Sequence, residues 1–76
     1  DFGLMVWDGV SPGTALNVLR LALIGSPCVV YDTARIVVRT IRNPGDWRGM
    51  LHDAGHEVEQ HVASRMTPDE RARLAG

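Results

Sequence analysis

The hydrophobic residues in the first half of the chain fall into short runs that polar residues, glycine and proline separate. Residues 2–7 form a nearly continuous apolar run, which is typical of a strand covered on both faces, as in a parallel sheet. Residues 14–24 are rich in helix formers, and only Asn17 and Arg20 interrupt their apolar character. We therefore expect a helix that is buried around most of its circumference. Gly25 follows where a left-handed C-cap is required.

A second apolar run, residues 28–31, completes a strand–helix–strand unit. The two strands of such a unit are parallel in almost every known case. Residues 35–42 are predicted to form a third strand, and the arginines at both of its ends indicate an edge of the sheet. The pattern of residues 1–42 thus predicts an α/β fold with a βαβ unit, a short parallel sheet and an edge strand.

Residues 43–76 are predicted to form a helical tail. Asn43 is a suitable N-cap, Pro44 suits the first helical position, and an acidic residue follows in the first turn. This helix is expected to end near Gly55. Its buried face is predicted to consist of Trp47, Met50 and Leu51.

Two further segments of this tail carry helical signals. Between residues 57 and 66, Val58 and Val62 are four positions apart and polar residues surround them. The sequence Thr-Pro-Asp-Glu at 67–70 is a capping box, which predicts a short polar helix over residues 69–75. No repeat, low-complexity tract or linker divides the chain, so we predict a single α/β domain over residues 1–76.

The composition sets limits on partners and location. The chain has 76 residues and a formal net charge of −1, which argues against a general electrostatic grip on nucleic acid. No apolar stretch is long enough to cross a bilayer, so no membrane partner is expected. The single cysteine, Cys28, cannot form an intramolecular disulfide, which favours a reducing cytoplasm. Cys28 is predicted to be a buried core residue.

The chain begins with Asp and enters an apolar run almost at once. We therefore expect it to be the C-terminal part of a larger α/β domain.

The loop between the first strand and the first helix is the best candidate for a binding site. In open α/β folds, ligands bind at the carboxyl edge of the sheet, where this loop lies. The helix N-terminus offers unpaired backbone N–H groups and a partial positive charge, which suit an anion. Gly9 and Gly13 let the backbone approach a phosphate closely, and Ser11 and Thr14 add hydroxyl donors.

Two more polar residues flank this loop. Asp8 can accept a hydrogen bond from a ribose hydroxyl or an amine, and Asn17 lies one turn into the helix on the side of Gly13 and Thr14. The same residues also fit a plain strand-to-helix turn in which Thr14 is only an N-cap, and spacing alone does not separate the two interpretations. The loop is not a P-loop and lacks the Gly-x-Gly-x-x-Gly spacing of dinucleotide-binding folds.

The loop resembles a signature of the SLOG superfamily, a group of Rossmann-like proteins related to the LOG phosphoribohydrolases and to DNA-processing protein A. The similarity is to the YspA/YpsA-related bacterial branch and covers about the first half of the chain. The matching residues are Asp8, Gly9, Ser11, Gly13, Thr14 and Asn17. The resemblance implies a Rossmann-like sheet and binding of a nucleotide or nucleotide-derived molecule at these six residues. No cofactor is expected.

The resemblance gives less support to catalysis. The LOG enzymes carry a catalytic carboxylate at the last position of a Gly-Gly-x-Gly-Thr-x-x-Glu motif, where this chain has Asn17. An amide cannot act as a general base, so the sequence gives less support to hydrolysis of an N-glycosidic bond. Asp8 remains as a substitute carboxylate. The sequence favours a nucleotide sensor or a weak nucleotide-processing protein.

Other residues carry rival interpretations. His52 and His56 have the i, i+4 spacing of zinc ligands on a helix, and His61 follows, but solvated or capping histidines are favoured because Gly55 is expected to end that helix. Trp7 can stack on a base, although core packing is favoured at the end of a buried strand.

The alternative function is that of a structural or interaction fragment without a ligand. A three-stranded sheet with one buried helix leaves an apolar face uncovered. Self-association into a homo-oligomer, a missing N-terminal segment or a partner chain is then expected to cover that face.

Overall fold

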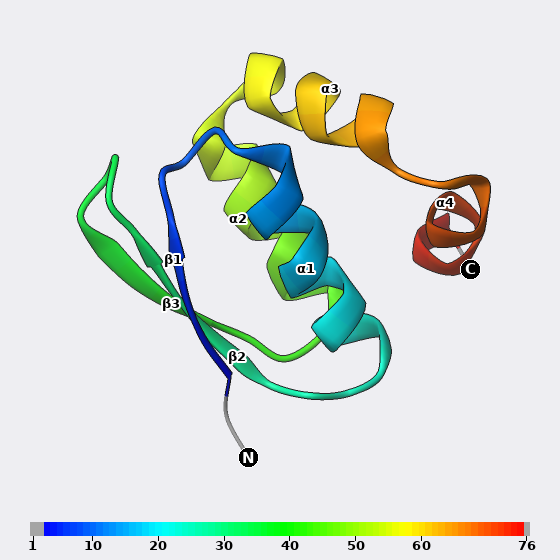
Figure 1. Ribbon diagram of the computed structural model, residues 1–76, viewed down its shortest axis with the longest axis horizontal. Helices are drawn as coiled ribbons and strands as arrows, with labels where there is room; N and C mark the ends of the chain where they lie inside the picture. The colour runs from blue at the N-terminus through cyan, green and yellow to red at the C-terminus, as the bar shows by residue number, and fades with distance from the viewer. Residues whose placement is uncertain (1–2, 76) are drawn as a thin grey trace.

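The structure is a computed structural model that describes residues 3–75. Asp1 and Phe2, which belong to the predicted first strand and to the SLOG-like run, lie outside the described residues. A three-stranded sheet and four helices make up the described part of the chain (Figure 1). In chain order they are β1 (Gly3–Trp7), α1 (Pro12–Leu23), β2 (Cys28–Asp32), β3 (Val37–Ile41), α2 (Pro44–Ala54), α3 (His56–Arg65) and α4 (Pro68–Ala75).

The predicted βαβ unit is confirmed. β1 and β2 are parallel neighbours, with Trp7 opposite Asp32, and α1 connects them. β3 then returns antiparallel to β2 with Ile41 opposite Cys28, so that β2 is the central strand and the sheet is mixed. The chain thus has the predicted α/β fold, with β3 as an edge strand.

The third strand begins at Val37, whereas the pattern predicted a start at Arg35. The Asp32 carboxylate accepts hydrogen bonds from the backbone N–H groups of Ala34 (3.0 Å) and Arg35 (3.1 Å), which closes a turn at the end of β2. Ile36 completes this turn with a positive φ of 55°. An aspartate that binds the backbone two and three residues ahead competes with strand pairing, so Arg35 is a turn residue.

Helix α1 begins at Pro12, two residues before the predicted start. Ser11 is the N-cap residue, so the interpretation of Thr14 as an N-cap is wrong. Proline suits the first helical position because its φ is already helical and its missing N–H would find no partner there. At the other end, Gly25 adopts φ +74° and a Schellman motif forms, which confirms the predicted C-cap.

The core lies between the sheet and the helices α1, α2 and α3. The predicted buried faces of α1 and α2 are confirmed, and the indole N–H of Trp47 donates to the Ala15 carbonyl (2.8 Å), which joins α2 to α1. The buried side chains are Trp7, Ala15, Leu16, Val18, Leu19, Ala22, Cys28, Val30, Ile41, Trp47, Met50, Leu51 and Val62. The predicted burial of Cys28 is therefore also confirmed.

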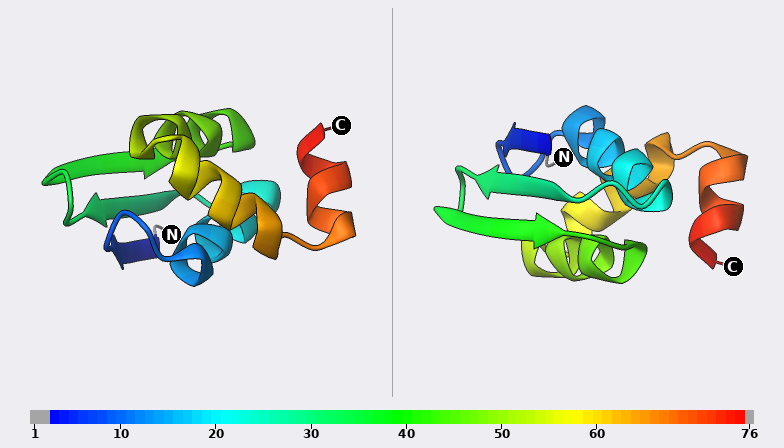
Figure 2. Two further views of the ribbon diagram at one scale, coloured as in Figure 1. Left: turned by 90° about the horizontal axis from the view of Figure 1, so that it is seen from above. Right: turned by 90° about the horizontal axis from the view of Figure 1, so that it is seen from below.

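These helices all cover the same face of the sheet. In Figure 2, α3 is nearest to the viewer when the molecule is seen from above, and β2 and β3 are in front when it is seen from below. Leu4 and Val6 alternate with inward-facing residues and are 74% and 63% exposed. The prediction that the first strand is covered on both faces is therefore wrong for the described residues, because no described helix lies on the second face.

The C-terminal residues form the three helices α2, α3 and α4. The Asn43 side chain accepts a hydrogen bond from the Asp46 N–H (2.8 Å), which confirms the predicted start of α2. Gly55, with φ +107°, ends α2 and begins α3. The capping box before α4 is confirmed by two reciprocal bonds between Thr67 and Glu70, of 2.9 and 3.1 Å. Within residues 3–75 no helix has the length and hydrophobicity needed to span a membrane.

Candidate functional site

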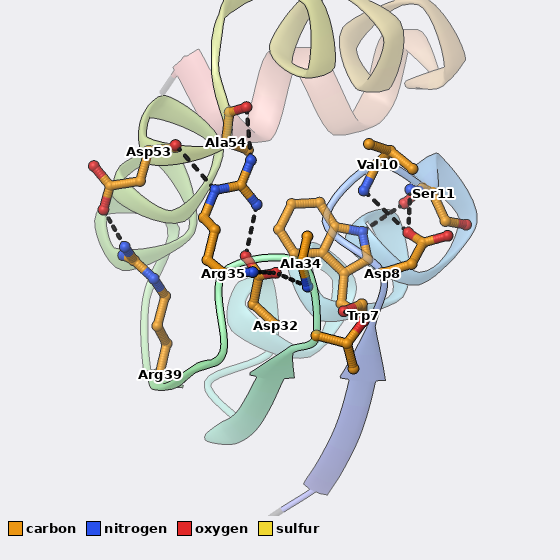
Figure 3. Close-up of polar contacts among 11 residues, drawn as sticks. Trp7, Asp8, Val10, Ser11, Asp32, Ala34, Arg35, Arg39, Asp53 and Ala54 are labelled. Carbon is orange, nitrogen blue, oxygen red and sulfur yellow. Dashed lines mark hydrogen bonds and ion pairs between the residues drawn. The ribbon is translucent and has the colours of Figure 1, made fainter.

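The candidate loop follows β1 and lies beside the turn that follows β2 (Figure 3). The Thr33 N–H donates to the Trp7 carbonyl over 2.8 Å, which continues the parallel pairing into the loop. A Cβ atom on Gly9 would lie only 2.8 Å from both Ala34 Cβ and an Arg35 guanidinium nitrogen. The segments that follow the two parallel strands are thus in direct contact at the carboxyl edge of the sheet, the edge at which open α/β folds bind ligands.

Asp8 fixes the conformation of the loop. Its Oδ1 atom accepts hydrogen bonds from the Val10 N–H (3.0 Å) and the Ser11 N–H (2.7 Å). These two bonds hold the pKa of the Asp8 carboxyl below its usual value, because they favour the charged form. The predicted role of Asp8 in binding a ribose hydroxyl or an amine therefore rests on its second carboxylate oxygen.

The two glycines of the loop have different surroundings. Gly9 has φ +84° and no room for a side chain, so the close packing of the loop against the neighbouring turn explains its presence. Gly13 lies at the second position of α1, and a Cβ atom placed there would have no neighbour within 4 Å. Gly13 therefore leaves open space at the N-terminus of α1.

The first turn of α1 is not capped by a side chain. Ser11, the N-cap residue, makes no side-chain capping hydrogen bond, and no acidic residue stands in the first turn. Pro12 has no N–H, so the Gly13 and Thr14 amides are the donors that the helix presents at this end. The hydroxyl-bearing residues Ser11 and Thr14 are both half-buried beside them. This arrangement suits a bound anion.

Asn17 lies one turn into α1, as predicted, and also takes part in other contacts. Its side-chain oxygen accepts a hydrogen bond from Arg20 (3.2 Å), and Arg20 also forms an ion pair with Glu70 (3.0 Å) on α4. Asn17 thus belongs to a polar network that joins α1 to α4. The other five candidate residues lie together on the loop and the first turn of α1.

Two residues at this edge were missed as site residues. The Asp32 carboxylate is 2% exposed and pairs with Arg35 Nη1 (2.7 Å). Arg35 also donates to the carbonyls of Asp53 (3.2 Å) and Ala54 (2.8 Å) at the end of α2, as Figure 3 shows. The signal in the sequence is an aspartate directly after the second apolar run, at the same edge as the loop.

Burial alone would raise the pKa of Asp32. The side-chain and backbone hydrogen bonds of Arg35, its positive charge and the Ala34 N–H outweigh burial, and the pKa is lowered. Asp32 therefore stays ionised and holds Arg35 against the loop.

Trp7 is a core residue. Its side chain is fully buried, and the indole N–H donates to the Ser11 carbonyl over 2.9 Å. The interpretation as core packing is confirmed, and the indole has no face open to a base. Through this bond Trp7 also holds the N-cap residue of α1 in place.

The three histidines do not share a helix face. His52 lies on α2, and His56 begins α3, since Gly55 separates the two helices. His52 lies 3.9 Å from Glu59, and the histidine side chain is exposed. Within residues 3–75 no group of three or more His, Cys, Asp or Glu side chains is arranged to hold a metal ion.

A cavity of about 360 Å³ lies elsewhere in the molecule, between α2, α3 and α4. Its lining is largely apolar and consists of Trp47, Arg48, Leu51, His52, Glu59, Ala63, Met66 and Leu74. None of the six candidate residues contributes to it.

Comparison of this chain with models of protein families, with curated proteins and with solved structures gives no significant match.

Proposed function

We propose that this chain binds the phosphate group of a nucleotide or nucleotide-derived molecule at the N-terminus of α1. The Gly13 and Thr14 amides and the Ser11 and Thr14 hydroxyls donate hydrogen bonds to the phosphate. The Asp8 carboxylate oxygen that makes no loop hydrogen bond accepts a ribose hydroxyl. In this proposal the chain is a nucleotide-binding module of the SLOG type.

The observation that carries the proposal is the open, uncapped first turn of α1. Two main-chain N–H groups point out of a helix end that carries a partial positive charge. The N-cap serine makes no capping bond, and the space beside Gly13 is empty of protein atoms. Phosphate oxygens bind well in such a setting because they accept several hydrogen bonds at once.

The proposal concerns binding and not hydrolysis. Asn17 carries no charge and its oxygen already accepts from Arg20. A carboxylate is the group that glycosidic-bond cleavage uses as acid, base or nucleophile. Asp8 is the carboxylate nearest in sequence to the residues proposed to bind the phosphate. Any weak hydrolysis of an N-glycosidic bond would therefore depend on Asp8.

A pair of glycine substitutions tests the proposal. Gly13 and Gly49 are both exposed helical glycines with open space where a Cβ would stand. Changing either to alanine is expected to stabilise its helix by up to about 1 kcal/mol, since alanine has the higher helix propensity. Only Gly13→Ala is expected to weaken phosphate binding, by about tenfold or 1.4 kcal/mol, and Gly13→Val by more.

The measurement is isothermal titration calorimetry with AMP, ribose 5-phosphate and inorganic phosphate. Unfolding curves of the same variants show whether each remains folded. If the unsubstituted chain binds none of the three compounds, or if Gly49→Ala weakens binding as much as Gly13→Ala, the proposal is wrong.

A further inference from the structure

The cavity between α2, α3 and α4 has an apolar interior and a charged rim. Its apolar lining consists of Trp47, Leu51, Ala63, Met66 and Leu74. The rim consists of Arg48, His52 and Glu59. The volume of about 360 Å³ lies near the lower end of the range for ligand pockets. The cavity therefore suits a small molecule better than a peptide.

The rim brings a cation and an anion to the same opening. Arg48 and His52 lie one turn apart on α2, so their side chains are neighbours on one face of that helix. His52 Nδ1 lies 3.9 Å from Glu59 Oε1 on α3. The three side chains thus form a row from α2 to α3, with a guanidinium group at one end and a carboxylate at the other.

Both charged groups can make further hydrogen bonds. Arg48 Nη2 donates to the Leu74 carbonyl over 2.6 Å, and within residues 3–75 no other oxygen accepts from this side chain. A guanidinium group has five N–H donors, so Arg48 can also bind a carboxylate. The Glu59 side chain is 40% exposed, and its distance of 3.9 Å to His52 is too long for a hydrogen bond. Glu59 can therefore accept from an ammonium group.

We propose that this cavity binds a free α-amino acid with an apolar side chain. The side chain of the ligand lies in the apolar interior, against Trp47 and Leu74. The ligand carboxylate accepts hydrogen bonds from Arg48, and the ligand ammonium group donates to Glu59. An α-amino acid carries both groups on one carbon atom, which matches a rim with both charges at one opening.

Charge complementarity favours this class over simpler apolar ligands. An uncharged apolar molecule would leave both rim charges without a partner. A carboxylic acid without an amino group would place its charge beside Glu59, and an amine without a carboxylate would place its charge beside Arg48. A zwitterion pairs with both.

The cavity is independent of the proposed phosphate site. The residues proposed to bind the phosphate belong to the loop and the first turn of α1, and none of them lines the cavity. Binding of an amino acid and binding of phosphate can therefore fail separately in an experiment.

Nuclear magnetic resonance titration of the full chain with L-phenylalanine is the first test. Trp47 lines the cavity and Trp7 does not, so only the indole N–H signal of Trp47 is expected to shift. A ligand of this size is expected to bind with a Kd of about 0.1–1 mM. Inorganic phosphate is expected to shift the Gly13 and Thr14 amides instead. No shift of the Trp47 indole up to about 10 mM L-phenylalanine, or an equal shift of both indoles, overturns the inference.

Two analogues of L-phenylalanine test the pairing of charges. Phenethylamine lacks the carboxylate and 3-phenylpropionate lacks the ammonium group. Each is expected to bind at least about tenfold more weakly than L-phenylalanine, since it meets a rim group of its own charge. Equal binding of all three compounds would show that the cavity accepts any apolar molecule, and would overturn the inference.

Substitutions at the rim then assign each charge. Glu59→Gln is expected to weaken binding of L-phenylalanine about tenfold without weakening that of 3-phenylpropionate. Arg48→Gln is expected to weaken it as much without weakening that of phenethylamine. Glu57→Gln is the matched control, because Glu57 is an exposed residue of α3 that does not line the cavity. Circular dichroism shows which variants are folded, and one folded rim variant is sufficient. A folded rim variant that binds L-phenylalanine like Glu57→Gln contradicts the proposed pairing.

Discussion

Arg35 Nη1 lies 2.7 Å from Asp32 Oδ2, in an ion pair whose carboxylate is almost completely buried. The same guanidinium donates to the Ala54 carbonyl (2.8 Å), so the pair joins the end of β2 to the end of α2. It also forms the wall against which Gly9 packs. The candidate loop therefore depends on this pair for its position.

Removing the Asp32 carboxylate is expected to destabilise the fold strongly. Asp32→Ala leaves Arg35 half-buried without its counterion and opens the turn after β2, at a cost of about 3 kcal/mol. Asp53→Ala is the matched control, because Asp53 pairs with Arg39 but is 50% exposed, and its loss is expected to cost less than about 1 kcal/mol. Urea unfolding measures both, and equal costs would show that burial of the Asp32 pair is unimportant.

The stability of the fold is expected to fall in acid. The pKa values of Asp32, Glu70 and Asp8 are all lowered in the folded chain. A carboxyl group with a lowered folded-state pKa stabilises the fold above its unfolded pKa, and this contribution is lost as the pH falls through the folded-state value. The free energy of unfolding should therefore be level above about pH 5 and decrease below about pH 4.

The contribution of Asp32 to this decrease can be isolated. In Asp32→Asn the decrease between about pH 5 and pH 2 is expected to be shallower than in the unsubstituted chain, since one linked group is gone. Unfolding by urea at a series of pH values measures it. An unchanged slope would show that Asp32 does not titrate with a lowered pKa.

Substitutions at two glycines with positive φ distinguish the cost of backbone strain from the cost of a steric clash. Gly25→Ala meets open space and is expected to cost about 1–2 kcal/mol for the left-handed backbone alone. Gly9→Ala has the same backbone cost and also places Cβ 2.8 Å from Ala34 Cβ, so it is expected to cost at least about 2 kcal/mol more. Thermal unfolding compares the two, and equal costs would contradict the close packing of the loop on the turn.

Glu70 is expected to hold α4 on the body of the molecule. The Thr67 N–H bond lowers the pKa of Glu70 against the opposing effect of burial, and Arg20 lowers it further. Glu70→Gln removes the charge from this network and should speed hydrogen exchange of the α4 amides about tenfold, or 1.4 kcal/mol of local stability. Asp69→Asn changes an exposed carboxyl in the same turn and should have little effect. Similar exchange rates in the two variants would show that Glu70 does not anchor α4.

The geometry of the candidate site could be predicted from the sequence only in part. Asp8, Ser11 and Thr14 were predicted to lie close together because they are near neighbours in the sequence, and the structure places them together on the loop and the first turn of α1. Asp32 and Arg35 were missed because a turn residue at the end of one strand becomes a site neighbour only when the next strand pairs beside it. Gly9 was assigned to phosphate contact, whereas its environment shows a packing role that no local pattern reveals.

The sequence by itself determined several of the helix ends of this protein. Asn43, the capping box of Thr67 and Glu70, and the C-cap Gly25 formed as predicted, because each satisfies backbone groups only a few residues away. The apolar periodicity likewise predicted the buried faces of α1 and α2, since a helix repeats its face every few residues.

Only the tertiary structure decided the contacts between residues distant in the chain. Arg35 meets the Ala54 carbonyl across 19 positions, and Arg20 meets Glu70 across 50. It also decided that the helices gather on one face of the sheet and leave Leu4 and Val6 exposed. An apolar residue in a strand indicates only that the position is suited to burial. The arrangement of the other elements determines whether anything covers it.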